Sequence, residues 1–379
     1  MIITTIKVLI VFLIIRAYRF FVTVFFIPNV GVQKKALIVR LDNIGDFVLW
    51  KNSAEVLLSD LHKKGYCVSL IANSSWASYA DKILPFDEVI AYDFGSIIKT
   101  KFFGFALVKK LVLDDFDLVI NPVFSRNIYI SDPVVLATNA REKIGCLGDC
   151  SNLSKIENFF SKFIYTKLIN VGDNFLHELQ NNENFLRNIG VLGDLAVRPQ
   201  LPKIAMKNVT FPENFFILAI GSSWAGKSWP LIRFKALSKW LISEYKFTPV
   251  IIGGEYDREN GDFIVDGDGL NLCGKTSLEV LANIFSKSRF VISNDSAAIH
   301  FAYSAGTPAI CILGGGHFGR FLPYPKIKDG FPVPRAVHAN MNCFGCNWKC
   351  CYKRRPDEPV KCIDNVTLDM VKKEVVLLL

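Results

Sequence analysis

Short apolar runs alternate with helical stretches along most of this chain, and this alternation restricts the possible folds more than any other feature of the sequence. A first series of runs ends in a polar, weakly periodic stretch at 152–202, and a second series follows it. Strands that alternate with helices form parallel sheets with helices on both faces. The sequence therefore predicts an α/β protein with two Rossmann-like domains, whose parallel sheets face a central cleft.

The length of 379 residues fits this division into two domains. Strands are predicted at 36–41, 67–72, 88–91, 117–121, 215–220, 249–253, 290–293 and 309–313. Helices are predicted between them, among others at 102–113, 277–286 and 297–305. We place an N-terminal segment at 1–30, the first domain at 31–200, the second at 201–365 and a C-terminal helix at 366–379.

The net charge of +9 is unevenly distributed. Residues 1–35 hold five basic residues and no acidic one, so the rest of the chain is nearly balanced. A nucleic-acid binder would instead carry a basic stripe on a folded domain. We therefore expect no nucleic-acid partner, and we expect the N-terminus to contact a membrane.

The N-terminal segment is apolar enough for such a contact. Fifteen of the twenty residues from Val8 to Ile27 are Leu, Ile, Val or Phe. Their insertion is worth about −7 kcal/mol, which Arg16 and Arg19 nearly cancel at about +6 kcal/mol. Three alternatives stay open: a helix in the membrane interface, a spanning helix, and a buried helix of the fold. No small-residue cleavage site follows the run, so we do not expect a secretory signal.

Two stretches match nucleotide-binding motifs. Gly221–Ser228 fits G-x-x-x-x-G-K-S after a predicted strand, the pattern of a P-loop in an ATP-dependent phosphotransferase. However, Trp229-Pro230 follows where the helix of a P-loop should already have begun. Gly314–Gly319 fits G-x-G-x-x-G, but the prolines after it exclude the helix that a dinucleotide site requires. We favour a phosphate-facing loop of another kind at 221–230 and a plain loop at 314–319, with the phosphotransferase as the alternative function.

A further polar stretch, Asn294–His300, lies at a predicted strand-to-helix junction. Asp295 or Ser296 can cap the helix, and the unpaired N–H groups of its first turn attract anions. Lys227, in the loop after a neighbouring strand, can reach the same anion. The stretch predicts a site for an anionic leaving group such as a diphosphate, with a capped helix that binds nothing as the alternative.

Four motifs, in order, resemble glycosyltransferase family 9, the lipopolysaccharide heptosyltransferases. They are Ala36–Asp46 (ALIVRLDNIGD), Gly221–Pro230 (GSSWAGKSWP), Leu272–Leu278 (LCGKTSL) and Ser293–His300 (SNDSAAIH), the last together with Ala305–Pro308 (AGTP). They extend over residues 36–325, and their order makes the set more specific than any single motif. The resemblance implies a GT-B fold, with the acceptor on the first domain and the nucleotide-sugar on the second.

The resemblance also implies an inverting, metal-independent transfer of a sugar, typically heptose from ADP-heptose, to a lipopolysaccharide core or a similar lipid-linked glycan. Its partners would be the nucleotide-sugar donor, the glycan acceptor and a membrane surface. The protein would be peripheral or N-terminally anchored at the cytoplasmic face of the inner membrane.

The site residues implied by the resemblance lie in these motifs. Asp46 matches the general base, although it is also a favourable residue in the first turn of a helix. The matching donor-binding residues are Ser223 and Lys227 at the phosphates, Glu255 at the ribose, Thr276 on the adenine side, and Asp295, Ser296, Ala297 and His300 at the pyrophosphate. His300 is also compatible with a packed core.

Two further features bear on the substrates. Many family members have Thr-Gly where this chain has Ser296-Ala297, and alanine prevents the closest backbone approach, which bears on the donor sugar more than on the nucleotide. Arg126, Arg141 and Lys143 are candidates for binding phosphates or carboxylates of the acceptor, with solvated surface charges as the alternative.

Five of the ten cysteines lie in the loop 343–362. Thiolates at Cys343, Cys346, Cys350 and Cys362 fit a structural zinc ion or iron–sulfur cluster, but the spacing lacks the paired C-x-x-C of a zinc ribbon. Free cysteines in a packed loop and a redox switch stay open as alternatives. No metal or cofactor is expected for catalysis.

Overall fold

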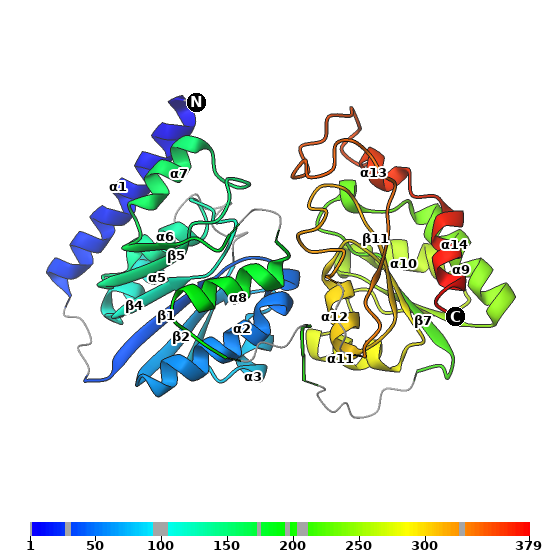
Figure 1. Cartoon of the computed structure of the whole chain (residues 1–379), viewed down its shortest axis with the longest axis horizontal. Coiled ribbons are helices and arrows are strands. Elements are labelled where there is room, and N and C mark those ends of the chain that lie inside the picture. The colour runs from blue at the N-terminus through cyan, green and yellow to red at the C-terminus, as the bar shows by residue number, and fades with distance from the viewer. Residues whose placement is uncertain are drawn as a thin grey trace. The chain divides into compact units, whose positions relative to one another are not determined.

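The computed structural model describes residues 2–26, 32–93, 105–172, 176–193, 198–202, 211–325 and 330–379. The chain divides into two compact units, Met1–Leu195 and Ala196–Leu379. Each unit contains a six-stranded sheet in which all paired strands run parallel (Figure 1). The predicted α/β class with two parallel sheets is confirmed.

The sheet of the first unit has the strand order β3-β2-β1-β4-β5-β6. Its strands are β1 (Lys34–Arg40), β2 (Tyr66–Asn73), β3 (Glu88–Tyr92), β4 (Leu118–Asn121), β5 (Glu142–Cys146) and β6 (Lys167–Ile169). Its helices are α1 (Ile2–Phe25), α2 (Ile44–Lys63), α3 (Ala77–Ile83), α5 (Phe105–Leu113), α6 (Ser131–Ala137), α7 (Lys155–Lys162) and α8 (Glu178–Asn188). The central strand β1 pairs with β2 and β4, and its residues 36–40 are buried.

The sheet of the second unit has the order β12-β11-β10-β7-β8-β9. Its strands are β7 (Phe215–Ala219), β8 (Thr248–Ile252), β9 (Leu270–Asn271), β10 (Val291–Asn294), β11 (Ala309–Ile312) and β12 (Arg335–Val337). Its helices are α9 (Leu231–Tyr245), α10 (Arg258–Val265), α11 (Leu278–Lys287), α12 (Ala297–Ala305), α13 (Lys361–Asp364) and α14 (Leu368–Val376), with 3-10 turns η1 (Ala225–Lys227) and η2 (Glu255–Asp257). All eight predicted strands are present in the two sheets, within one or two residues at each end.

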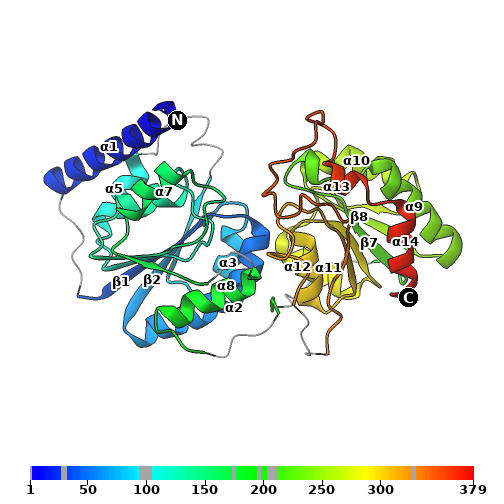
Figure 2. The ribbon, with the colours of Figure 1, turned by 45° about the horizontal axis from the view of Figure 1, so that its top comes forward.

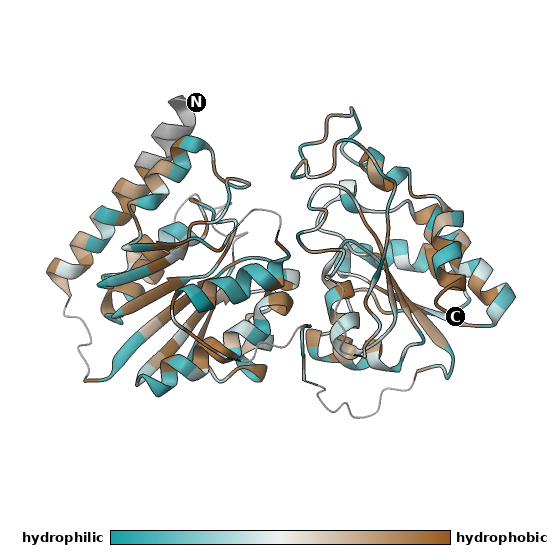
Figure 3. Ribbon diagram, in the orientation of Figure 1, coloured by the Kyte–Doolittle hydropathy of each residue, from teal (hydrophilic) through white to brown (hydrophobic). Residues whose placement is uncertain are grey.

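Apolar residues concentrate in the strands, whereas the helices contain both apolar and polar residues (Figure 3). In the second unit, Phe216, Leu218 and Ile292 of neighbouring strands form the centre of one buried cluster. A parallel sheet needs such continuous apolar strands because helices cover both of its faces. The predicted helix 102–113 is α5, whose described part begins at Phe105, since residues 101–104 lie outside the described residues.

Helix α1 lies against α5, α6 and α7 of the first unit (Figures 1 and 2). Ile15 and Val22 are buried in the core of the unit, while Leu13 and Phe20 on the same helix are exposed. In the described part of the chain, no helix has both the length and the apolar character that crossing a bilayer requires. Through Ile15 and Val22, helix α1 is packed as a helix of the fold, and it keeps one exposed apolar face.

Two cations meet the C-terminal end of helix α6. Arg19 Nη1 donates to the carbonyls of Leu136 and Thr138, both at 3.2 Å, and Lys143 Nζ donates to the Thr138 carbonyl at 2.8 Å. The last carbonyls of a helix carry partial negative charge and attract cations. Burial, with the charges of Arg19 and Arg16 nearby, lowers the pKa of Lys143 to about 8. These contacts tie α1 to the interior of the unit.

We expect Ile15→Ala to destabilise the first unit by about 2–5 kcal/mol, because the substitution leaves a cavity in a core where Ile15 is 1% exposed. Leu13→Ala is the matched control, since Leu13 is 65% exposed two residues away on the same helix. Its effect should stay within about 0.5 kcal/mol. Urea denaturation followed by circular dichroism measures both, and equal effects of the two substitutions would show that α1 is not packed as described.

Lys143 should make the free energy of unfolding rise with pH. Its pKa of about 8 in the folded protein lies below the ordinary value of 10.5, so between these values the unfolded chain binds more protons than the folded protein. The free energy of unfolding then increases as the pH rises through this window. Lys143→Met should abolish that increase, which denaturation of both proteins at several pH values would measure. A difference between them that is constant with pH contradicts the expectation.

Candidate functional site

Both sheets share one strand order, and this order indicates where a ligand would bind. Counted in chain order within each unit, the strands lie 3-2-1-4-5-6. In doubly wound sheets, ligands bind beyond the carboxyl ends of the strands at the point where the order reverses, next to the first strand. In the second unit this point lies between β7 and β10, and the segments that follow these two strands contain Lys227 and Asp295.

Asn294, the last residue of β10, connects these two segments. Its buried side chain donates from Nδ2 to the carbonyl of Ile220 at 2.6 Å and accepts at Oδ1 from the amide of Trp229 at 2.9 Å. A buried amide is costly to leave unpaired, so both hydrogen bonds resist being broken. The loop 221–229 is thereby fixed near both of its ends to the end of β10.

The fixed loop brings two charged candidates together. Lys227 Nζ lies 3.3 Å from Asp295 Oδ2, and their side chains are only 15% and 11% exposed. The same ammonium group lies over the ring of Trp348, 4.5 Å from its centroid. An ion pair that is partly shielded from water is stronger than one at the surface. The pair therefore keeps Lys227 beside the start of α12.

Helix α12 begins at Ala297, with Ser296 as its N-cap residue. The side chain of Ser296 makes no capping hydrogen bond, and its hydroxyl lies instead 3.1 Å from Ser293 Oγ. Of the two predicted caps, Asp295 or Ser296, the side chain of Ser296 does not cap the helix, and the carboxylate of Asp295 pairs with Lys227. The N–H groups of the first turn are therefore not satisfied by the N-cap side chain and keep their capacity to bind an anion.

The loop 221–230 is not built as a P-loop. Residues Ala225–Lys227 form a single 3-10 turn, and α9 begins only at Leu231, after Pro230. Ser228 Oγ lies 2.6 Å from Ser222 Oγ, within the loop itself. A P-loop continues directly into its helix and reserves the serine hydroxyl for a magnesium ion. The geometry thus favours the phosphate-facing loop of another kind over the phosphotransferase.

Other predicted donor residues lie in loops at the same edge of the second sheet. Glu255, in η2 after β8, is exposed and pairs with Arg258 at 2.9 Å. Ser223 is exposed in the loop after β7, Thr276 is half-buried between β9 and α11, and Ala297 is half-buried at the start of α12. Their direct contact with a donor stays a prediction.

His300 occupies a packed position one turn into α12. Its side chain is buried, and Nδ1 lies 2.7 Å from the hydroxyl of Tyr324, which is buried as well. The two rings meet edge to face, with their centroids 5.7 Å apart. This environment is that of a core histidine, and its predicted contact with the pyrophosphate stays a prediction.

In the first unit, Asp46 lies in the first turn of α2, directly after β1. Its Oδ2 accepts from the amide of Asn43 at 3.3 Å, as part of a capping box. Arg40 is fully buried and donates from Nη2 to the carbonyl of Asp46 at 3.4 Å. A second carboxylate, that of Asp42 between β1 and α2, was not among the predicted site residues and lies 2.9 Å from Arg40. An acidic residue two positions after a basic one need not lie beside it, so the sequence alone does not predict the pairing. In the structure, Arg40 Nε donates to Asp42 Oδ1 at 3.1 Å.

Two of the three predicted acceptor-binding residues are buried, and their assignment is corrected. Arg126 is 1% exposed, and its guanidinium lies over the ring of Tyr165 and 3.8 Å from the carboxylate of Asp132. Lys143 lies beneath α1, bonded to the end of α6. Both charges lie inside the fold of the first unit, shielded from a ligand in solution. Arg141 is exposed and remains a predicted acceptor residue.

The Cys-rich loop packs against the glycines that follow β11. A side chain on Gly314 would come within 2.7 Å of the Trp348 ring, and one on Gly315 would overlap Phe344. The amide of Asn347 donates to the carbonyl of Gly316 at 2.9 Å. The predicted plain loop at 314–319 is confirmed, and its glycines provide the space in which the Cys-rich loop docks.

Among the described residues, no three His, Cys, Asp or Glu side chains come together as a metal site, and this includes the cysteines of the loop. Cys362 is buried and its thiol accepts from the amide of Gly315 at 3.3 Å, while Cys351 is exposed. We derive no role for a metal from this arrangement. The structural metal stays a prediction of the cysteine spacing.

Comparisons of the sequence with known proteins agree with this geometry. The profile of glycosyltransferase family 9 (heptosyltransferase) matches residues 105–342. Lipopolysaccharide heptosyltransferase 1 of Campylobacter coli is 29% identical over 106 residues, which are 26% of this chain and 31% of that protein. The chain thus aligns with about a third of the length of this relative.

Solved structures share the fold. The glycosyl transferase family 9 protein of Veillonella parvula DSM 2008 has a TM-score of 0.63 at 18% identity, covering 91% of this chain and 97% of that one. The E. coli heptosyltransferase WaaC with ADP-2-deoxy-2-fluoro heptose has a TM-score of 0.61 at 16% identity, covering 90% and 99%. These likenesses confirm the predicted GT-B type of fold. Since the family profile covers well over half of the chain, the protein belongs to glycosyltransferase family 9 (heptosyltransferase).

Proposed function

We propose that this protein transfers a sugar, heptose from ADP-heptose, onto a lipopolysaccharide core or a similar lipid-linked glycan, with inversion and without a metal ion. The membership of family 9 supports a glycosyl transfer, and the name of the Campylobacter coli relative supports heptose and lipopolysaccharide. The ligand in the WaaC structure, an ADP-heptose analogue, supports the nucleotide.

The observation that carries the proposal is the start of α12 beside Lys227. An N-terminal turn without a side-chain cap offers backbone N–H groups to an anion, and Lys227 lies next to it through its pair with Asp295. The nucleoside diphosphate that leaves the donor gains negative charge as its bond to the sugar breaks. Helix N–H groups and an ammonium group stabilise that charge. Asp295 acts by positioning Lys227.

The acceptor side of the reaction needs one base. In an inverting transfer, the acceptor oxygen forms its bond to the anomeric carbon as the bond from that carbon to the diphosphate oxygen breaks. The proton of the acceptor hydroxyl must go to a nearby base, and we assign this role to the carboxylate of Asp46. Its place at the end of the central strand β1 supports the assignment, because ligands of doubly wound sheets bind there.

We also propose that α1 holds the enzyme on a membrane surface with anionic lipids. The exposed apolar side chains of this face are Ile10, Leu13, Phe20, Phe21, Val24 and Phe25 on α1, with Phe159 on α7 and Phe163 just after it. Arg16 and Lys162 are exposed on the same two helices and favour a negatively charged surface. A surface so rich in exposed phenylalanine marks an interaction site.

Asp46→Asn should lower the rate of sugar transfer by a factor of about 10²–10⁴ and leave the affinity for ADP unchanged. The amide keeps an oxygen that can accept from Asn43, so α2 should stay intact. Asp60→Asn is the control on the same helix, since Asp60 lies near the far end of α2 and pairs with Lys64 there. A transfer assay with purified acceptor and ADP-heptose, run with and without EDTA, measures the effect. Full turnover of the Asp46 variant, or an equal loss of transfer in the Asp60 variant, would refute the base assignment.

Replacing Phe20 and Phe25 together by serine should weaken binding to vesicles by a factor of about 10²–10⁴, because each buried phenylalanine contributes about 1.5–3 kcal/mol. Transfer to a soluble, deacylated acceptor should not change. Phe263→Ser is the control, since Phe263 is exposed on the second unit. Cosedimentation with vesicles of phosphatidylethanolamine and phosphatidylglycerol measures the binding. Unchanged binding of the double variant excludes α1 as the membrane contact.

A further inference from the structure

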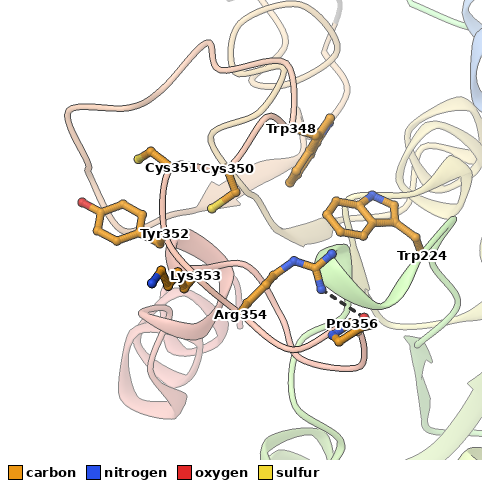
Figure 4. Close-up of a pocket in the computed structure, with 8 residues that line it drawn as sticks. All are labelled: Trp224, Trp348, Cys350, Cys351, Tyr352, Lys353, Arg354 and Pro356. Carbon is orange, nitrogen blue, oxygen red and sulfur yellow. Dashed lines mark hydrogen bonds between the residues drawn. The ribbon is translucent and has the colours of Figure 1, made fainter.

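Arg40 of the first unit has partners of a different kind from those of Arg354 in the second. Arg354 lines a pocket of about 580 Å³, and its guanidinium donates to main-chain carbonyls (Figure 4). This pocket is also lined by Trp348, over whose ring Lys227 lies, so it belongs to the candidate donor site. Arg40 instead contacts two carboxylates and the main chain of Asp46, the proposed base. Its contacts therefore bear on the acceptor side of the reaction.

All three nitrogen atoms of the Arg40 guanidinium are engaged. Nε donates to Asp42 Oδ1 at 3.1 Å, Nη1 donates to Asn182 Oδ1 at 3.3 Å, and Nη2 donates to the carbonyl of Asp46 at 3.4 Å. Glu178 Oε1 lies 3.8 Å from the same Nη2. The side chain of Arg40 is fully buried, where such contacts are stronger than in water. The guanidinium thereby joins the end of β1, the start of α2 and the start of α8.

Helix α8 reaches α2 through a second contact. Asn182 of α8 is buried, and its Nδ2 donates to the carbonyl of Leu49 on α2 at 3.4 Å, while its Oδ1 accepts from Arg40. The two helices lie side by side (Figures 1 and 2). A buried amide that is paired on both sides is costly to displace. The N-terminal half of α2, which contains Asp46, is therefore held by β1 through Arg40 and by α8 through Asn182.

The charges that meet at this point do not cancel. Asp42, Asp46 and Glu178 are acidic, and Arg40 is the cation that contacts all three residues. A nearby positive charge favours the ionised form of a carboxyl group, and a nearby negative charge disfavours it. Arg40 therefore favours the ionised form of Asp46, which can accept a proton, whereas Glu178 favours the protonated form. The two residues act on the same base in opposite directions.

Other titratable groups on the surrounding elements are paired or neutral. Lys51 of α2 pairs with Glu55 of the same helix at 2.6 Å. His177, the N-cap residue of α8, accepts at Nδ1 from a main-chain amide of that helix at 3.2 Å. Cys146 at the end of β5 lies near Glu178, and burial raises the pKa of its thiol to about 12, so the thiol stays neutral. Strand β2, which also packs against α2, contains no charged residue.

We propose that Arg40 and Glu178 are positioning residues for the base of the transfer reaction. Arg40 holds the main chain of Asp46 in place and keeps its carboxylate ionised. Glu178 strengthens the affinity of this carboxylate for a proton, because a general base is most effective when its pKa approaches the working pH. Neither residue needs to touch the substrate. The inference rests on the proposed function and extends its base to partners on β1 and α8.

The test is the pH dependence of sugar transfer by the full-length protein, with ADP-heptose and a purified acceptor. On the acid side the rate falls as the base becomes protonated. Arg40→Gln removes a positive charge and should move this acid limb to higher pH by about one unit, whereas Glu178→Gln removes a negative charge and should move it to lower pH by about as much. Two shifts of opposite sign are not expected from a loss of stability.

A further variant separates the position of the base from its charge. Arg40→Lys keeps the positive charge but loses the fork of hydrogen bonds to Asp46 and Asn182. Its acid limb should therefore stay in place, while kcat falls by about tenfold and KM for ADP-heptose does not change. Glu183→Gln is the matched control, since Glu183 lies on α8 and pairs with Arg187 of the same helix at 2.6 Å. It should leave the pH profile and kcat unchanged.

An acid limb that Glu178→Gln leaves in place, or that Arg40→Gln and Glu178→Gln move in the same direction, overturns the proposal. If Arg40→Gln fails to fold because two buried carboxylates lose their cation, Glu178→Gln and Arg40→Lys still decide. Full turnover of Asp46→Asn would refute the base assignment itself. Loss of transfer in Asp46→Asn, together with an acid limb that no other variant moves, refutes only the inference about Arg40 and Glu178.

Discussion

The two hydrogen bonds of the Asn294 amide are the contact on which the candidate site of the second unit depends. They fix the loop after β7 to the end of β10, so that Lys227 and Asp295 meet although 68 positions separate them in the numbering of the chain. The ion pair therefore lies between β7 and β10, where the strand order reverses. It is next to the start of α12, where the side chain of the N-cap residue Ser296 makes no capping hydrogen bond. Each step follows from the one before. A parallel sheet aligns the strand ends, the Asn294 amide ties two loops together, and this tie positions a cation beside the N-terminal turn of a helix.

The cations of this chain serve two different purposes, and burial separates them. Arg40, Arg126 and Lys143 are buried, and each lies beside a group of the first unit that offsets its charge: Asp42 for Arg40, Asp132 for Arg126, and the end of α6 for Lys143. A buried cation must be paired in this way because its desolvation is otherwise too costly. Arg354 is held by main-chain carbonyls alone, which orient the guanidinium and leave its charge uncompensated by them. The chemistry of the partner, more than exposure alone, distinguishes a structural cation from one that can bind a ligand.

Much of the fold could be predicted from the sequence, and the failures have physical reasons. Strands with apolar runs, such as β1 and β10, were predicted because continuous hydrophobicity is what a sheet covered on both faces requires. Strands β5, β6, β9 and β12 were not. Strands β6, β9 and β12 have only two or three residues at a sheet edge, and β5 begins with the charged residues Glu142 and Lys143, so none of the four carries a continuous apolar run. In the candidate site, residues within motifs that follow a strand, such as Lys227 and Asp295, were predicted from the sequence. The burial of Arg126, the pairing of Arg40 with Asp42 and the docking of Trp348 on Gly314 depend on contacts between distant segments or on the folded backbone, which periodicity and spacing do not encode.

Helix α1 shows how tertiary contacts change the meaning of a hydropathy pattern. When insertion free energies are summed residue by residue, Arg19 opposes insertion of this apolar segment into a membrane. In the folded unit its guanidinium bonds to the carbonyls at the end of α6, so this charge belongs to the protein side of the helix. A helix that is apolar on nearly all sides is usually buried all round. Here Ile15 and Val22 enter the core, while Phe20 and Phe25 remain outside it. The exposed face is therefore more apolar than the sequence average suggests, because Arg19, one of the two arginines that lower this average, is turned inward, while Arg16 stays exposed.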